Sequence, residues 1–218
     1  MNRKDIKTLK DYCLAPTREI LNNEMYLFID NDSSVLGVAH ADVHFPPKQW
    51  YFSYNNTLDL AFSPNLDDRL GVFLLLEYLP RFVKIDILIT DNEEIELSTA
   101  KFFYPKKEYN WIVGFDKSGD GIAIYNYKWD VKYLYKYFDP IVEGNYSDIC
   151  AMYHLKTMAF NVGINYYDAH QINCYAPLDA TRESVAKFLY FYEENKNKKF
   201  PFQLEKEVEE VLEDEEEE

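Results

Sequence analysis

The sequence is poor in cysteine and has no long hydrophobic run. Its 218 residues contain three cysteines, at positions 13, 150 and 174, without Cys-x-x-Cys spacing. An odd and scattered set argues against a disulfide scaffold and predicts a reducing, cytoplasmic setting. No apolar stretch is long enough to cross a bilayer, and the first residues lack the apolar core of a signal peptide. We therefore expect no membrane partner.

Positive charge is also scarce. The chain has 23 Lys and Arg against 38 Asp and Glu, a net charge of −15. Nucleic-acid binding needs a basic face, so we expect no nucleic-acid partner. Ten of the acids lie in the last fourteen residues. We predict that residues 204–218 form a disordered acidic tail, a solubilising extension that could also bind a basic partner.

What the chain does have is enough apolar sequence for one sizeable core, because 47% of it is hydrophobic. Strands and helices alternate in the expected pattern. We expect strands at 24–30, 35–40, within 50–62, and at 83–89, 109–115, 122–127 and 157–164. We expect helices within 5–23, from Asp67 or Asp68 as N-cap to Pro80, and at 100–103, 129–138, 148–155 and 178–192. The alternation predicts an α/β three-layer sandwich, with a central, mostly parallel mixed sheet flanked by helices.

A short apolar run, residues 35–39, ends in His40-Ala41-Asp42. Side chains two residues apart share one face of a strand, so His40 and Asp42 should project together at its carboxyl end. A carboxylate beside a neutral imidazole can orient the ring toward a divalent metal. Taken alone, a His-x-Asp pair is more often part of a solvated loop than a metal site.

Further acids and a histidine follow predicted strands or lie in loops. They are Asp67, the pair Glu93-Glu94, Asp116 and His170. Two histidines with several carboxylates and no thiolate suit one or two Zn²⁺, Mn²⁺ or Co²⁺ ions. Of two adjacent glutamates, one can bind the metal while the other takes the proton from water.

Five segments in this order resemble the co-catalytic zinc exopeptidases, which include leucine, glutamyl and tetrahedral aminopeptidases, carboxypeptidases and N-acyl amino acid hydrolases. The segments are Val38-Ala39-His40-Ala41-Asp42, Leu66-Asp67-Asp68-Arg69-Leu70-Gly71, Ile89-Thr90-Asp91-Asn92-Glu93-Glu94-Ile95, Gly114-Phe115-Asp116 and Tyr167-Asp168-Ala169-His170. The resemblance spans roughly residues 15–193.

The resemblance implies a dinuclear site holding two Zn²⁺, with Co²⁺ or Mn²⁺ as alternatives. It assigns His40 and Asp116 to one metal, Glu94 and His170 to the other, and Asp67 as the bridge, joined to Asp68 through an unusual peptide geometry. It also makes Glu93 the general base and Asp42 the group that orients His40.

Three departures from the family pattern concern the loops. Glu96 stands where a glycine is frequent, Asn165 precedes Tyr166 in place of a glycine, and residues 172–174 lack a frequent glutamate. We therefore expect a different specificity pocket, lined by Tyr166 and Tyr167. Asp148 fits a helix N-cap, although a substrate-binding role is the alternative.

The spacing between motifs leaves no room for a second domain. His40 to Asp67 spans 27 residues, and Asp116 to His170 spans 54. We predict a single catalytic domain, residues 1–200, without an inserted lid or dimerisation domain, and a monomer or weak oligomer.

Three functions remain open from the sequence. An aminopeptidase acting on peptides comes first, and a deacylase of acylated amino acids or a carboxypeptidase on the same scaffold comes second. A catalytically silent binding protein is the third, against which Glu93 argues. His44, four residues after His40, could compete for the metal, whereas His154 fits packing.

Overall fold

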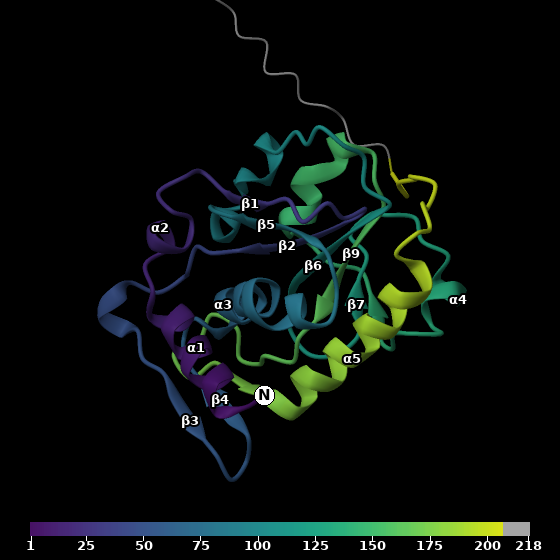
Figure 1. Cartoon of the computed structure of the whole chain (residues 1–218). Coiled ribbons are helices and arrows are strands. Elements are labelled where there is room, and N and C mark those ends of the chain that lie inside the picture. Colours follow the sequence, from purple (N-terminus) through teal and green to yellow (C-terminus); the bar gives the residue numbers. More distant parts are fainter. Residues whose placement is uncertain (207–218) are drawn as a thin grey trace, which may run out of the picture.

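A mixed seven-stranded sheet forms the centre of the computed structural model, which describes residues 1–206 (Figure 1). The strand order is β1-β5-β2-β6-β9-β7-β8, and the four strands β5, β2, β6 and β9 run parallel. β1 pairs antiparallel with β5, and β7 antiparallel with β9. The strands are β1 Leu27–Ile29, β2 Val35–His40, β5 Asp86–Thr90, β6 Trp111–Lys117, β7 Ile122–Ala123, β8 Ile141–Val142 and β9 Ala159–Gly163. The predicted α/β sandwich with a mostly parallel sheet is confirmed.

Helices cover both faces of this sheet. The α-helices are α1 Arg3–Leu14, α2 Thr17–Ile20, α3 Leu66–Phe73, α4 Val131–Leu134 and α5 Leu178–Asn195. Figure 1 shows α1, α3 and α5 on one side of the sheet and short 3₁₀ segments on the other, among them Thr99–Phe102 and Asp148–Leu155. None of the helices within residues 1–206 combines the length and the hydropathy needed to cross a membrane.

The position of β2 creates the place for a site. From β2 the chain passes through α3 to β5 on one side, and then returns to β6 on the other side. A crevice forms outside the carboxyl ends of parallel strands where neighbouring connections diverge in this way. All six residues of β2 are buried, and its last residue is His40.

A second, three-stranded antiparallel sheet was not predicted as a unit. It consists of β3 Ser53–Asn55, β4 Leu60–Phe62 and β10 Tyr175–Pro177. The strand–turn–strand within 50–62 supplies two of its strands, and β10 comes from a distant part of the sequence. β10 follows the loop that carries His170, so this small sheet anchors one end of that loop.

Several predicted element ends were wrong. α3 begins at Leu66 with Asn65 as its N-cap, so Asp67 and Asp68 lie in the first turn and do not cap it. Within residues 1–206, the one cis peptide bond precedes Pro140, so the unusual geometry expected between Asp67 and Asp68 is not a cis bond. After α3 the chain widens into a π-helix over Leu74–Tyr78 and then tightens into a 3₁₀ turn over Leu79–Arg81. The α-helix does not continue through this turn, because Pro80 lacks the N–H that an α-helix requires.

Other elements are shorter than predicted. The strand expected at 122–127 ends at Ala123, because Tyr125 and Asn126 take left-handed backbone angles. The helix expected at 129–138 is α-helical only over α4, and the one at 148–155 is a 3₁₀ helix. At the start of the predicted tail, Leu204 forms an isolated antiparallel β-bridge with Tyr127. The rest of the predicted tail, residues 207–218, lies outside the described residues.

Gly71 allows α3 to lie directly on the sheet, and its replacement tests that packing. A β-carbon at Gly71 would come within 1.9 Å of the Phe115 carbonyl oxygen, a backbone atom that cannot rotate away. We expect Gly71→Ala to lower the free energy of unfolding in urea by about 1–3 kcal/mol, the usual range for overpacking. The control is Gly119→Asn, since that position is open and asparagine tolerates its positive φ. Equal losses in the two variants would contradict the packing.

Candidate functional site

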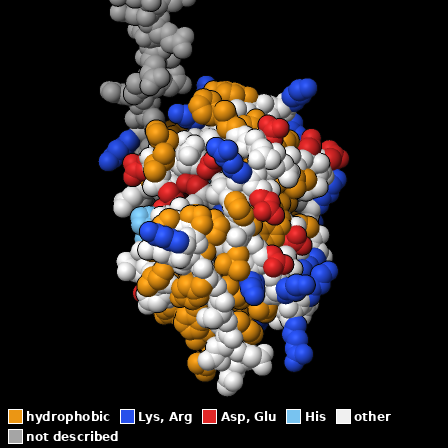
Figure 2. All heavy atoms as spheres, turned by 90° about the vertical axis from the view of Figure 1, so that its left-hand side faces the viewer, with side chains coloured by type: hydrophobic (Ala, Val, Ile, Leu, Met, Phe, Trp, Pro, Cys, Tyr) orange, Lys and Arg blue, Asp and Glu red, His pale blue; other side chains and the backbone are white. Residues whose placement is uncertain are grey.

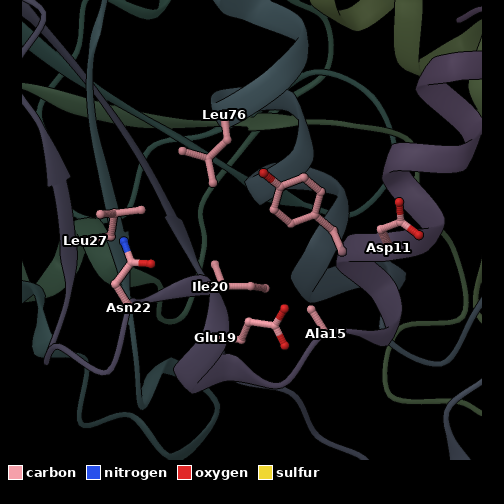
Figure 3. A pocket seen from close by; sticks show the side chains of 8 residues that line it. Asp11, Ala15, Glu19, Ile20, Asn22, Leu27 and Leu76 are labelled. Carbon is pink, nitrogen blue, oxygen red and sulfur yellow. The ribbon is translucent and has the colours of Figure 1, made fainter.

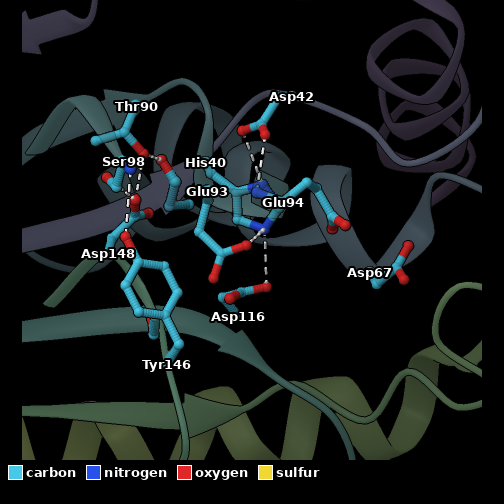
Figure 4. A network of polar contacts seen from close by, with 12 residues as sticks. His40, Asp42, Asp67, Thr90, Glu93, Glu94, Ser98, Asp116, Tyr146 and Asp148 are labelled. Atoms are coloured by element: carbon cyan, nitrogen blue, oxygen red, sulfur yellow. Dashed lines mark hydrogen bonds and ion pairs between the residues drawn. The ribbon is translucent and has the colours of Figure 1, made fainter. Parts of the chain in front are cut away.

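The inner half of the site surrounds the imidazole of His40, which is 2% exposed (Figure 4). Its Nδ1 lies 3.3 Å from Asp42 Oδ1. Its Nε2 lies 3.2 Å from Asp116 Oδ1 and 3.8 Å from Glu93 Oε2. Burial favours the neutral ring, but Asp116 and the other two carboxylates raise the pKa of His40 well above its ordinary value. The Nε2 atom therefore faces a place that favours positive charge.

The outer half is built from His170, Glu94 and Asp67. His170 Nε2 lies 3.2 Å from Glu94 Oε1 and 3.8 Å from Asp67 Oδ2. The backbone N–H of His170 donates to Asp67 Oδ2 at 2.9 Å. His170 has a left-handed backbone conformation, with φ of 56°, which residues other than glycine seldom adopt. The bond to Asp67 helps to hold this conformation.

Backbone contacts connect the segments that carry these side chains. Asp42 Oδ2 accepts the backbone N–H of Glu94 at 3.0 Å, so Asp42 contacts both His40 and the glutamate loop. On β9, Asn161 Oδ1 accepts the backbone N–H of Asp116 at 2.8 Å. The Tyr166 hydroxyl donates to the Asp116 carbonyl at 2.7 Å. The position of Asp116 is thus set by two neighbours that are distant in sequence.

Asp148 fastens the base of the glutamate loop. Its Oδ1 accepts the hydroxyls of Thr90, at 2.8 Å, and of Ser98, at 2.5 Å. Thr90 ends β5 before the two glutamates, and Ser98 follows them. Burial raises the pKa of Asp148 to about 6. The predicted N-cap role is wrong, because Ser147 occupies the N-cap position, without a side-chain cap bond.

The carboxylates of the site are crowded and incompletely paired. Burial raises the pKa of Glu93 to about 8 and that of Asp68 well above its ordinary value, and neighbouring carboxylates add to both shifts. In the described part of the chain, Asp42 Oδ1, Asp67 Oδ1 and both Asp68 oxygens are buried without a hydrogen-bond partner. Buried anionic oxygens without donors are costly, and a divalent cation satisfies several of them at once.

Three groups of side chains in residues 1–206 have ligand atoms close enough to share an ion. Within each group the atoms lie within 4.8 Å of one another. The groups are His40 with Glu93 and Asp116, His40 with Asp68 and Glu94, and His44 with Glu94 and His170. The donor set of imidazole and carboxylate fits Zn²⁺, Co²⁺ or Mn²⁺.

The structure brings together the seven side chains for which metal or catalytic roles were predicted: His40, Asp42, Asp67, Glu93, Glu94, Asp116 and His170. The two tyrosines predicted to line a pocket differ in exposure. Tyr166 is 5% exposed and points its hydroxyl at the Asp116 backbone. Tyr167 is partly exposed and stacks on Tyr175.

Sequence reasoning missed Asn161, Thr90 and Ser98. The side chain of each hydrogen-bonds Asp116 or Asp148, at least 45 positions away. A single asparagine, threonine or serine has no spacing pattern that would identify it. Only Thr90 lies within one of the five segments, where it directly precedes Asp91.

A separate pocket of about 350 Å³ lies between α1, α2 and β1 (Figure 3). Its lining includes the apolar side chains of Ile20, Leu27 and Leu76, and the acidic residues Asp11 and Glu19. No histidine or cysteine lines it. The chemistry described above therefore belongs to the cluster around His40 and not to this pocket.

Replacing Tyr166 tests whether it positions Asp116. We expect Tyr166→Phe to lower the free energy of unfolding by about 1–2 kcal/mol, because the Asp116 carbonyl loses its donor in a buried place. The matched control is Tyr167→Phe, whose hydroxyl bonds the Asn165 side chain on a more exposed ring. Tyr167→Phe should lower the free energy of unfolding by less than about 0.5 kcal/mol. Urea unfolding measures both, and a neutral Tyr166→Phe would contradict the role.

Comparison with known proteins finds likeness only in structure. No family model and no curated protein matches the sequence. An aminopeptidase from the archaeon Desulfurococcus kamchatkensis superposes with a TM-score of 0.60 at 13% identity, over 88% of this chain and 95% of that one. A tripeptidase from Staphylococcus aureus gives a TM-score of 0.57 at 12% identity, over 75% of this chain and 82% of that one. Aminopeptidase PepT from Bacillus cereus gives 0.54 at 11% identity, over 86% and 91%.

These likenesses concern the fold, since the identities are low. They cover most of this chain and most of each peptidase. The fold expected from the five short segments is confirmed: the chain has the α/β sandwich of these peptidases.

Proposed function

We propose that this chain is a metal-dependent hydrolase of amide bonds, an aminopeptidase-type exopeptidase with a dinuclear zinc site. One observation carries the proposal. Two imidazole–carboxylate pairs, His40 with Asp116 and His170 with Glu94, each have a 3.2 Å contact and meet at one end of the sheet beside Asp67. The fold shared with aminopeptidases supports the same conclusion.

In this proposal the two pairs hold one Zn²⁺ each, and Asp67 lies between them. The partnerless oxygen of Asp67 and those of Asp68 provide acceptors that a cation would satisfy. Co²⁺ or Mn²⁺ could replace zinc, since both accept the same donors. Bound ions of this kind lower the pKa of water and polarise a carbonyl oxygen.

The chain's own residues would handle the proton and the geometry. Glu93 is the proposed general base. Its carboxylate faces Nε2 of His40, as that of Asp116 does, and within residues 1–206 it accepts no hydrogen bond. It would accept a proton from the attacking water and return it to the leaving amine. Asp42 would keep the His40 ring turned so that Nε2 faces the site.

The charge of the site favours a substrate amine. Within residues 1–206, the ion pairs of these carboxylates all involve histidine, and none involves lysine or arginine. A carboxypeptidase or deacylase needs a cation for the substrate carboxylate, whereas an acidic rim suits a free N-terminus. We therefore propose peptides as substrates of a single domain, residues 1–200, acting in the cytoplasm as a monomer or weak oligomer.

The direct test is turnover. Zinc-loaded protein is assayed against aminoacyl amides, short peptides with free or blocked N-termini, and N-acyl amino acids, each with and without chelator. We expect chelator-sensitive release of N-terminal residues from unblocked peptides only. Absence of turnover on every substrate would refute the hydrolase, and turnover of N-acyl amino acids alone would replace it by the deacylase.

Glu93→Gln tests the general base. The amide cannot take a proton, so we expect turnover to fall by about 10²–10⁴-fold while zinc content and the unfolding midpoint are retained. Glu96→Gln, in the same loop and exposed, is the matched control and should keep its activity. Steady-state rates and metal analysis measure both. Full activity in Glu93→Gln would disprove the assignment.

A further inference from the structure

A fourth histidine lies against the outer half of the site. His44 Nδ1 is 3.7 Å from Glu94 Oε2, while His170 Nε2 is 3.2 Å from Glu94 Oε1. The rings of His44 and His170 are 4.9 Å apart and nearly parallel, at 13°. Glu94 thus has one imidazole facing each of its two oxygens.

The turn after β2 determines where His44 lies. β2 ends at His40, so His44 is not on the strand. The indole N–H of Trp50 donates to the Phe45 carbonyl at 2.7 Å, and a 3₁₀ turn follows at Pro47–Gln49. Pro46 and Pro47 restrict the backbone of this turn further. A fixed turn of this kind presents His44 to the glutamate loop.

The surroundings of His44 do not explain it as a packing residue. Its side chain is 51% exposed, against 2% for His40. Apart from His170, the aromatic ring near it is Phe45, at 5.1 Å. In residues 1–206 no hydrogen bond involves its ring nitrogens, and its ion-pair contact is with Glu94. Figure 2 shows histidine atoms reaching the surface at the left edge of one face.

We propose that His44 is a further ligand of the metal ion held by Glu94 and His170. This inference rests on the proposed function, since it concerns one of the two ions. The ligand atoms of these three side chains already lie within 4.8 Å of one another. Both imidazoles are half exposed, so small rotations bring their nitrogens to a shared ion. A neutral imidazole also adds a donor without adding negative charge.

The two ions would then differ in coordination. With Asp67, the outer ion would have four protein donors, the number zinc takes in closed structural sites. The inner ion would have three, from His40, Asp116 and Asp67, and would keep the open position typical of catalytic zinc. His44 would therefore make the outer ion the more firmly held of the two.

The test compares His44→Ala with His154→Ala. His154 is the matched control, because its ring nitrogen contacts the Phe103 carbonyl, outside the site. Zinc per chain is measured by mass spectrometry, each dissociation constant by chelator competition, and the number of imidazoles per zinc by X-ray absorption. Circular dichroism checks the fold, which an exposed histidine should not disturb.

We expect two zinc ions in the wild type and His154→Ala, with three imidazoles shared between them. His44→Ala should leave two imidazoles and weaken the affinity for one ion by about 10–100-fold or more, while the affinity for the other ion stays unchanged. Two ions with unchanged affinities and imidazole count in His44→Ala would overturn the role of His44 and leave the proposed function standing. A wild-type protein without bound zinc would overturn both.

Discussion

The structure depends on one electrostatic constraint, the concentration of carboxylates around His40 and His170 at the carboxyl end of β2. Several of these groups are buried, and several of their oxygens lack a donor within residues 1–206. Burial alone favours neutral carboxyls, which is why the pKa of Asp67 and of Glu93 lies above its ordinary value. Such a cluster is stable as a set of anions only with positive charge at its centre, which a protonated imidazole provides in part and divalent cations provide fully.

The scaffold holds this cluster by fixing the helix and the loops that carry it. Asp67 and Asp68 lie in the first turn of α3, where the helix dipole favours negative charge. The glutamate loop is fastened at its base by Asp148 and at its tip by Asp42. Asp148 accepts the side-chain hydroxyls of Thr90 and Ser98, and Asp42 accepts the main-chain N–H of Glu94. Because these bonds leave the carboxylates of Glu93 and Glu94 unused, both remain free to face a cation or a substrate. Positioning and chemistry are thus carried by different atoms.

The two halves of the site differ in access to solvent. His40 is closed in by β2, α3 and the glutamate loop, whereas His170 is 53% exposed on a loop anchored by β10. A closed inner half suits fixed geometry, and an open outer half suits the approach of a chain end. The ion pairs of the described site carboxylates all involve histidine, which is the basis of the proposed preference for a substrate amine.

Local sequence determined the central strands, the alternation with helices and the order of metal-compatible side chains. Buried strands and strand-end motifs have short-range patterns, and parallel strands bring their carboxyl ends to one edge of the sheet. Residues 1–40 and 178–192 fold largely as their periodicity indicates. Tertiary structure alone decided five other features. They are the N-cap at Asn65, the pairing of β10 with β4, the bonds of Asp148 to Thr90 and Ser98, the bond of Tyr166 to Asp116, and the stacking of His44 on His170. Each depends on the meeting of residues far apart in the chain, and such a meeting is set by packing rather than by the local preference of either partner.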